Sequence, residues 1–299
     1  MRFVFPFLIL LCCGCIDQPE QQLVMSKFTT WNLPADGSRI PAPRALYADS
    51  EDTVYCLDDA GRVLLYSEDG TIQKVWRMPA SENGRPEGIV KLQDGRIAVA
   101  DTHYHRIVFF EPDGTVESML GTKGRDPGQF VYPVAVTQDP DGFLYVGEYG
   151  DRQRVQKFAI DGTFVTEFGE HGTELGQFQR PSGLIWHNHE ILVVDAFNNR
   201  IQVFSDEGEF LRVLGPPVDV EPFSFPYDLR MNHDGHIYVV ENQGARITLI
   251  NQQGNLLGRY GRPGRSQGQF FNPWGLTVLT DGRILVADTG NHRIVELTP

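Results

Sequence analysis

Positive charge is scarce in this sequence, which has 26 Lys and Arg residues against 39 Asp and Glu residues and a formal net charge of −13. General nucleic-acid binders neutralise phosphates with Lys and Arg and release counterions. The charge balance therefore argues against nucleic acid as a partner. Two basic spots remain, at Lys123 with Arg125 and at Arg262 with Arg265. We interpret them as solvated loop charges, with a binding role as the alternative.

No apolar run near the N-terminus is long enough to cross a membrane as a permanent helix. Phe3 to Leu11 is apolar but short, whereas a spanning helix needs about 20 residues. A positive residue, Arg2, precedes this stretch. The pattern is typical of a cleaved export signal.

Cysteine is limited to four residues, and three of them follow the apolar stretch: Cys12, Cys13 and Cys15. Gly14-Cys15 resembles a bacterial lipobox, in which signal peptidase cuts before a cysteine that becomes lipid-modified. We therefore predict a lipoprotein-type signal peptide at 1–14, a lipidated Cys15 and a polar tether at 15–26. The protein would be an exported lipoprotein anchored to a membrane of the bacterial cell envelope. Cleavage before Cys13 and a plain secretory signal are the alternatives.

No segment shows a sustained helical hydrophobic period. Short alternating runs occur instead, as at 143–148 and 155–159, and turn dipeptides such as Asp141-Gly142 and Asp161-Gly162 separate them. Asp-Gly is a strong hairpin signal because both residues accept positive φ. The fold is predicted to be all-β.

The chain repeats one pattern six times: a proline, a hydrophobic run ending in an acid, and Arg followed by a hydrophobic residue. The prolines recur every 43 to 48 residues, at Pro43, Pro86, Pro133, Pro181, Pro226 and Pro273. This period is typical of the four-stranded antiparallel blade of a propeller. The sequence therefore predicts a six-bladed β-propeller.

The sixth unit ends after three strands, which would leave an unpaired edge. Lys27 to Leu33 is a strand-like run that belongs to no repeat. We expect it to close the ring as the outermost strand of blade 6, so that 27–299 forms one domain. Cys56 lies in a hydrophobic strand of blade 1, and we expect no disulfide within the fold.

An acid recurs in five repeats, at Asp101, Glu148, Asp195, Glu241 and Asp288. A ring of carboxylates could bind a hard cation such as calcium. Each acid is followed five or six residues later by Arg, and a carboxylate paired with a guanidinium would brace every blade alike. We interpret this column as scaffold, because a residue present in every blade most simply builds the blade.

Function is expected in columns that differ between blades. The residue after each proline varies: Arg44, Glu87, Val134, Ser182, Tyr227 and Trp274. In the next column Asp228 stands among Ala and Gly residues. We predict that Arg44, Glu87, Tyr227, Asp228 and Trp274 form a polar and aromatic rim at the channel mouth, suited to a protein, peptide or glycan ligand. The alternative is that these residues face water.

Blade 2 carries His103-Tyr104-His105. Alternation along an extended segment would place His103 and His105 on one side, and Glu87 belongs to the same blade. Two imidazoles and a carboxylate match the ligand count of a catalytic zinc site. His105 shares a column with His292, so ordinary repeat structure is the alternative. We expect the protein to have no cofactor, and the alternative is a bound zinc or calcium ion.

The motifs Val-Ala-Asp-Thr-Gly-Asn-His-Arg-Ile at 286–294 and Gly-Gln-Phe-x-x-Pro at 128–133, 176–181 and 268–273 resemble the NHL repeat. The resemblance implies a six-bladed propeller and little about chemistry, because NHL-like propellers include RNA-binding and protein-binding modules, sensor domains and peptidyl-hydroxyglycine amidating lyases.

The amidating lyases hold zinc with histidines beside the proline columns, where this chain has none. Pro86-Glu87-Gly88 resembles an element of gluconolactonase-like propellers, with Asp228 as a candidate partner for Glu87. We therefore predict a monomeric, lipid-anchored binding scaffold. The alternative is a metal-dependent lyase or hydrolase acting at the same mouth, and the sequence leaves enzymatic activity undecided.

Overall fold

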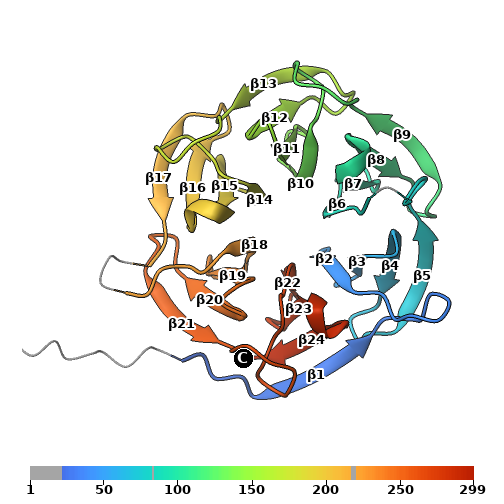
Figure 1. The fold of residues 1–299 in the computed structure, drawn as a ribbon, viewed down its shortest axis with the longest axis vertical. Helices are drawn as coiled ribbons and strands as arrows, with labels where there is room; N and C mark the ends of the chain where they lie inside the picture. The colour runs from blue at the N-terminus through green and yellow to red at the C-terminus, as the bar shows by residue number, and fades with distance from the viewer. Residues whose placement is uncertain (1–21, 83, 217–219) are drawn as a thin grey trace, which may run out of the picture.

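The computed structural model describes residues 22–82, 84–216 and 220–299. Six four-stranded antiparallel sheets surround a central axis as blades (Figure 1). The predicted signal peptide and Cys15 lie outside the described residues. No helix in the described part of the chain combines the length and apolar character needed to cross a membrane.

The strands of each blade follow one another outward from the axis. The innermost strands are β2 (Pro43–Ala48), β6 (Gly88–Lys91), β10 (Tyr132–Gln138), β14 (Pro181–His187), β18 (Pro226–Met231) and β22 (Leu276–Val278). The second strands are β3 (Val54–Asp58), β7 (Ile97–Asp101), β11 (Leu144–Tyr149), β15 (Glu190–Asp195), β19 (Ile237–Glu241) and β23 (Ile284–Asp288).

The third strands are β4 (Arg62–Tyr66), β8 (Arg106–Phe110), β12 (Arg154–Phe158), β16 (Arg200–Ser205), β20 (Arg246–Ile250) and β24 (Arg293–Thr298). The outer strands are β5 (Ile72–Arg77), β9 (Val116–Leu120), β13 (Phe164–Phe168), β17 (Phe210–Leu214), β21 (Leu256–Tyr260) and β1 (Lys27–Asn32). Short 3₁₀ turns follow three second strands: η1 (Thr102–Tyr104), η2 (Ala196–Asn198) and η3 (Thr289–Asn291).

The ring closes as the sequence predicts. Strand β1 pairs with β24 in antiparallel register from Lys27 opposite Thr298 to Asn32 opposite Arg293. Trp31 and Leu33 are buried against blades 6 and 1, and the Trp31 indole donates a hydrogen bond of 2.8 Å to Glu296. An N-terminal strand therefore completes blade 6 and removes the unpaired edge.

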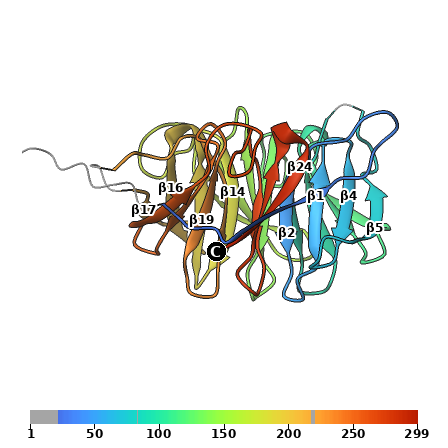
Figure 2. The same ribbon diagram turned by 90° about the horizontal axis from the view of Figure 1, so that it is seen from below.

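The core lies between neighbouring blades, because both faces of each inner sheet are covered. Second strands such as β7 and β23 are buried at every position, in keeping with their near-continuous Val, Ile, Leu and Ala content. Cys56 is buried and unpaired within this core. The rigid stack leaves two surfaces on which loops lie, one at each end of the axis (Figure 2).

The two loop surfaces differ in origin. One carries the hairpin turns that join first to second and third to fourth strands, and we call it the turn face. The other carries the loops that enter each innermost strand and those that leave each second strand, and we call it the mouth face. Each predicted proline lies at or just before the start of an innermost strand at the mouth face, and Pro133 is the second residue of β10. Proline is tolerated at strand starts and bulges because it has no N–H to donate to the ladder.

Candidate functional site

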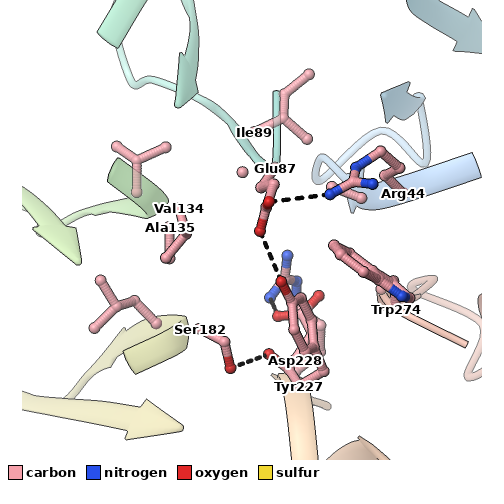
Figure 3. A pocket seen from close by; sticks show the side chains of 16 residues that line it. Arg44, Glu87, Ile89, Val134, Ala135, Ser182, Tyr227, Asp228 and Trp274 are labelled. Atoms are coloured by element: carbon pink, nitrogen blue, oxygen red, sulfur yellow. Dashed lines mark hydrogen bonds and ion pairs between the residues drawn. The ribbon is translucent and has the colours of Figure 1, made fainter. Parts of the chain in front are cut away.

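The residue after each proline lies at the mouth end of the axial channel, as the sequence predicts. In four blades a register shift follows the proline, as between Pro43 and Ala45 and between Pro226 and Asp228. Such bulges turn a side chain away from the regular alternation of the strand. The side chains that line the resulting channel come from all six blades and include Arg44, Glu87, Val134, Ser182, Tyr227 and Trp274 (Figure 3).

Glu87 is the electrostatic centre of this site. Its carboxylate forms an ion pair of 3.0 Å with Arg44 and accepts a hydrogen bond of 2.7 Å from the Tyr227 hydroxyl. Arg180 approaches the same carboxylate at 3.5 Å and donates to the Tyr227 hydroxyl at 2.8 Å. The Glu87 side chain is 3% exposed. One carboxylate therefore joins blades 1, 2, 4 and 5 across the mouth.

Asp228 lies deeper in the channel and has its own partner. It forms an ion pair of 2.7 Å with Arg230, and Arg230 also donates to the Leu46 carbonyl of blade 1 at 3.0 Å. Burial raises the pKa of Asp228 above its usual value, and the Arg230 charge opposes that shift. These side chains leave a cavity of only about 30 Å³ on the axis, which suits water rather than a ligand.

Aromatic rings and arginines continue outward from this centre over the mouth face. The Arg44 guanidinium lies 3.9 Å from the centre of the Trp274 ring, and Trp274 lies 4.5 Å from Tyr227. On the other side Arg180 lies 4.1 Å from the Tyr149 ring. These distances are typical of cation–π and aromatic contacts.

Further rings extend both ends of the series. Tyr149 stacks on Tyr132 at 5.0 Å. Tyr227 contacts Phe225 at 5.8 Å, and Phe225 stacks on Phe197 at 5.2 Å. The Phe197 side chain is 58% exposed. We call the whole series the aromatic arc: Tyr132, Tyr149, Arg180, Tyr227, Phe225, Phe197, Trp274 and Arg44.

Two members of the aromatic arc have unusual backbone conformations. Arg180 and Phe225 precede prolines and adopt φ of 64° and 54°, a left-handed conformation that is costly for large side chains. The previous blade holds each of them in place, because the Arg180 amide donates to the Gln153 side chain and the Phe225 amide donates to Asn199. This strain directs both side chains over the mouth.

The five residues predicted to form the rim lie together, but not all of them are exposed. The structure brings Arg44, Glu87, Tyr227, Asp228 and Trp274 to one channel mouth, but Glu87, Tyr227 and Asp228 are buried rather than exposed as a rim. The exposed part of the site consists of residues that the sequence reasoning missed, Phe197 above all. The sequence contains a sign of this residue, because Phe197 occupies the repeat position at which blade 6 has Gly290.

The structure does not bring the predicted metal ligands together. The expectation of an extended segment at His103 and His105 is wrong, because residues 102–104 form the turn η1 and His105 has left-handed φ. His105 Nδ1 contacts the Val131 carbonyl, and His292 contacts the Ile40 carbonyl in the same way. Glu87 is engaged by Arg44 and Tyr227. In the described residues no group of three or more His, Cys, Asp or Glu side chains is arranged to hold a metal ion.

The repeated acids brace the blades, as expected. Each pairs with its Arg at 2.6 to 3.0 Å: Asp101 with Arg106, Glu148 with Arg154, Asp195 with Arg200, Glu241 with Arg246 and Asp288 with Arg293. Asp58 and Arg62 form the same pair in blade 1. Four of these acids also accept an amide hydrogen bond from the loop entering their own blade. The repeated acids therefore have a structural role in each blade.

Comparisons with known proteins agree with this architecture. The NHL repeat family matches residues 270–297. Human NHL repeat-containing protein 3 is 27% identical over 169 residues, which cover 52% of this chain and 48% of that protein. Mouse peptidyl-glycine alpha-amidating monooxygenase is 27% identical over 190 residues, which cover 59% of this chain and 18% of that protein.

Among solved structures, a gluconolactonase from Xanthomonas campestris superimposes with a TM-score of 0.69 at 16% identity, covering 94% of this chain and 95% of that one. At this identity the likeness concerns the fold alone. The chain spans about half the length of the first curated relative and less of the second. Together these findings show a six-bladed propeller in which residues 270–297 match the NHL repeat.

Proposed function

We propose that this protein is a binding scaffold whose mouth face recognises a protein, peptide or glycan. The observation that carries this proposal is the aromatic arc, which combines rigid rings with two arginines in contact with them. Aromatic residues and Arg carry most binding energy at protein interfaces. The braced blades hold these side chains on a scaffold that needs little reorganisation on binding.

The size of the axial cavity favours recognition over the mouth rather than inside it. Small-molecule sites usually enclose about 300 to 1,000 Å³, whereas the channel holds a cavity of about 30 Å³. A ligand would therefore lie across the aromatic arc and contact the exposed Phe197. An extended peptide segment, a glycan or the surface of another protein fits this arrangement.

The names of two similar proteins, an amidating monooxygenase and a gluconolactonase, describe enzymes. The alternative function is accordingly a metal-dependent lyase or hydrolase at the same mouth. The chemistry of the described mouth favours the scaffold, because its side chains are mainly rings and guanidiniums. Glu87 accepts from Arg44 and Tyr227, so its oxygens already have donors.

We further propose that the scaffold is exported and anchored to a membrane through Cys15. One thiol would carry the acyl chains that hold an otherwise acidic domain at the envelope. Cys15→Ser should move the protein from the membrane fraction to the soluble fraction. Unchanged membrane retention of this variant would contradict the anchor without bearing on the mouth face.

The binding function can be tested by a matched pair of substitutions. Phe197→Ala removes the most exposed ring of the aromatic arc, and Ile160→Ala removes an apolar side chain that is 41% exposed on the turn face. Both should leave the melting temperature close to that of the wild type, because exposed side chains contribute little to stability. Affinity for partners captured from envelope extract should fall about tenfold or more for Phe197→Ala alone. Equal capture by both variants would overturn the proposal.

A further inference from the structure

The loop that enters blade 6, residues 261–272, is one of two basic spots on an acidic protein. It contains Arg262 and Arg265, and no acid occurs between Tyr260 and Asp281. Both arginines are exposed. Neither forms an ion pair with a carboxylate among the described residues. We call this segment the blade 6 loop.

Equivalent loops in two other blades show that the charge is not a requirement of the fold. Matching backbone bridges align Pro263 with His171 and Lys123, since each pairs with the buried Phe seven residues later. In this alignment Arg262 corresponds to Glu170 in the blade 4 loop and to Thr122 in the blade 3 loop. Among these three loops, a cation occupies this position in blade 6 alone.

Arg265 differs from its equivalents in residue type or in pairing. It corresponds to Thr173 and to Arg125, and Arg125 is neutralised by Asp151. Arg265 instead lies 5.7 Å from the ring of Phe271, a side chain that is 42% exposed. The corresponding residues of the other loops are Gln179 and Val131. The blade 6 loop thus presents two cations and an exposed ring together.

The first described residues of the chain lie beside this loop. Gln22 pairs with Arg259 on β21, and the Leu23 amide donates to the Arg259 carbonyl at 2.8 Å. Figure 1 shows this segment running along β21 at the junction of blades 5 and 6. A cleft of about 300 Å³ separates it from the blade 6 loop, and Gln22, Tyr260, Arg262 and Gln267 contribute to its walls.

Arginines deeper in the cleft already have acidic partners. Glu221 pairs with Arg246 at 2.9 Å and with Arg259 at 3.3 Å. The charge available to a ligand is therefore that of Arg262 at the edge of the cleft and Arg265 beside it.

The length of chain before Gln22 connects this patch to the proposed anchor. Seven residue steps separate Cys15 from Gln22, and a fully extended chain of that length spans at most about 25 Å. An acylated Cys15 would therefore hold the junction of blades 5 and 6 close to the membrane surface. Anionic lipids attract exposed Lys and Arg within about a Debye length.

We propose that the blade 6 loop docks on an anionic phospholipid surface, with Arg262 and Arg265 binding lipid phosphates and Phe271 entering the interface. The inference that the membrane lies at this edge of the ring rests on the proposed anchor at Cys15. The lipid affinity of the blade 6 loop does not rest on that anchor, because Arg262, Arg265 and Phe271 all belong to the described residues. Docking here orients the ring so that blades 2 and 3 lie farthest from the membrane.

The test uses the predicted mature chain, residues 15–299, with Cys15→Ser, so that neither the apolar signal sequence nor an acyl chain contributes to binding. Cosedimentation would measure partition onto vesicles of phosphatidylglycerol mixed with phosphatidylcholine, and onto vesicles of phosphatidylcholine alone. The test variant is Arg262→Glu with Arg265→Glu. The matched control is Lys123→Glu with Arg125→Glu, which makes the same change in net charge on the equivalent loop of blade 3.

We expect binding to anionic vesicles only, and a partition at least about twenty-fivefold lower in the test variant, since each of the two basic residues near the surface contributes about fivefold. The control should bind as the parent chain does. Equal losses in both variants would overturn the proposal, because vesicle binding would then depend on the net charge of the protein and not on the blade 6 loop. Calorimetric binding of inorganic phosphate without binding to vesicles would also overturn it, because the patch would then be a site for free phosphate.

Discussion

The mouth face and the turn face are built from the same six repeats but expose different chemistry. On the turn face, aspartates of the Asp-Gly hairpins accept hydrogen bonds from their own turns, as Asp113 does from Thr115 and Asp161 from Thr163. Among the large apolar side chains exposed in the described chain, only Ile160 lies in these turns. The mouth face exposes four: Ile40, Leu175, Phe197 and Phe271.

This contrast shows which positions of the repeat vary between blades. Hairpin turns need Asp, Asn or Gly at fixed positions because of their positive φ, so the turn face repeats itself. The loops of the mouth face are held by the acid and Arg pair and, in three blades, by a backbone bridge to a buried Phe, whereas other positions differ from blade to blade. Arg44, Trp274 and Phe197 occupy such positions, which is why binding is assigned to this face.

The largest effect should come from opening the ring, which removes the support common to both faces. Deleting residues 27–33 removes the whole ladder between β1 and β24 and exposes the surfaces that Trp31 and Leu33 cover. Burial of two large apolar side chains alone is worth about 5 kcal/mol, against about 5 to 15 kcal/mol for a typical domain. Urea denaturation should show loss of most of the stability. A midpoint equal to that of the intact chain would mean that β1 is not needed for closure.

The next largest effect should come from the buried centre of the mouth. Glu87→Ala leaves Arg44 and Arg180 without their shared carboxylate, and breaking a buried ion pair by removing one partner costs about 3 to 5 kcal/mol. Glu87→Gln should cost less, since the amide oxygen still accepts from Tyr227. Denaturant midpoints of the two variants would measure the difference. If Glu87→Ala is as stable as the wild type, Glu87 acts as a surface residue, contrary to its burial.

The fold was predictable because its signals are local and repeated. Asp-Gly turns act over a few residues, and the prolines recur every 43 to 48 residues. The run Lys27 to Leu33 is a short strand-like segment outside the repeats. The column after the prolines was placed correctly for the same reason. A repeat determines the position of a residue along its strand, and hence the end of the channel at which it lies.

The contacts within the site were less predictable. Arg180 reaches Glu87 and Tyr149 only because its φ is 64°, and an Arg before a proline gives no sign of that conformation. The burial of Glu87 depends on Tyr227, 140 residues away in sequence. The His103 and His105 prediction assumed an extended segment where the chain makes the 3₁₀ turn η1. Side-chain direction in irregular loops is decided by tertiary contacts that no single-sequence pattern contains.

A brace on the mouth face should be more sensitive than a turn carboxylate to the same substitution. Asp195 is fully buried and accepts hydrogen bonds from the Gln179 amide, Asn198, Arg200 and Gln202. Asp195→Asn places an amide NH₂ against some of these donors and should cost about 2 to 4 kcal/mol. Chemical denaturation would measure the loss, and capture per folded molecule should be unchanged. Reduced capture by the folded variant would show that the brace also positions the binding surface.

The smallest effect is expected for the same substitution on the turn face, Asp161→Asn. The hydrogen bond from the Thr163 amide lowers the pKa of the exposed Asp161 carboxyl below its usual value. A lowered folded pKa means that this carboxylate stabilises the fold above the pKa of the unfolded chain, and that the contribution is lost as pH falls through the lower folded value. Asn keeps an acceptor for Thr163, so thermal melts at neutral pH should match the wild type. Melts between neutral pH and about pH 3 should show a slightly shallower acid-induced loss of stability for the variant. A loss at neutral pH as large as that of Asp195→Asn would show that turn carboxylates brace the ring as strongly as the acids of the mouth face do, and the contrast between the two faces would fail.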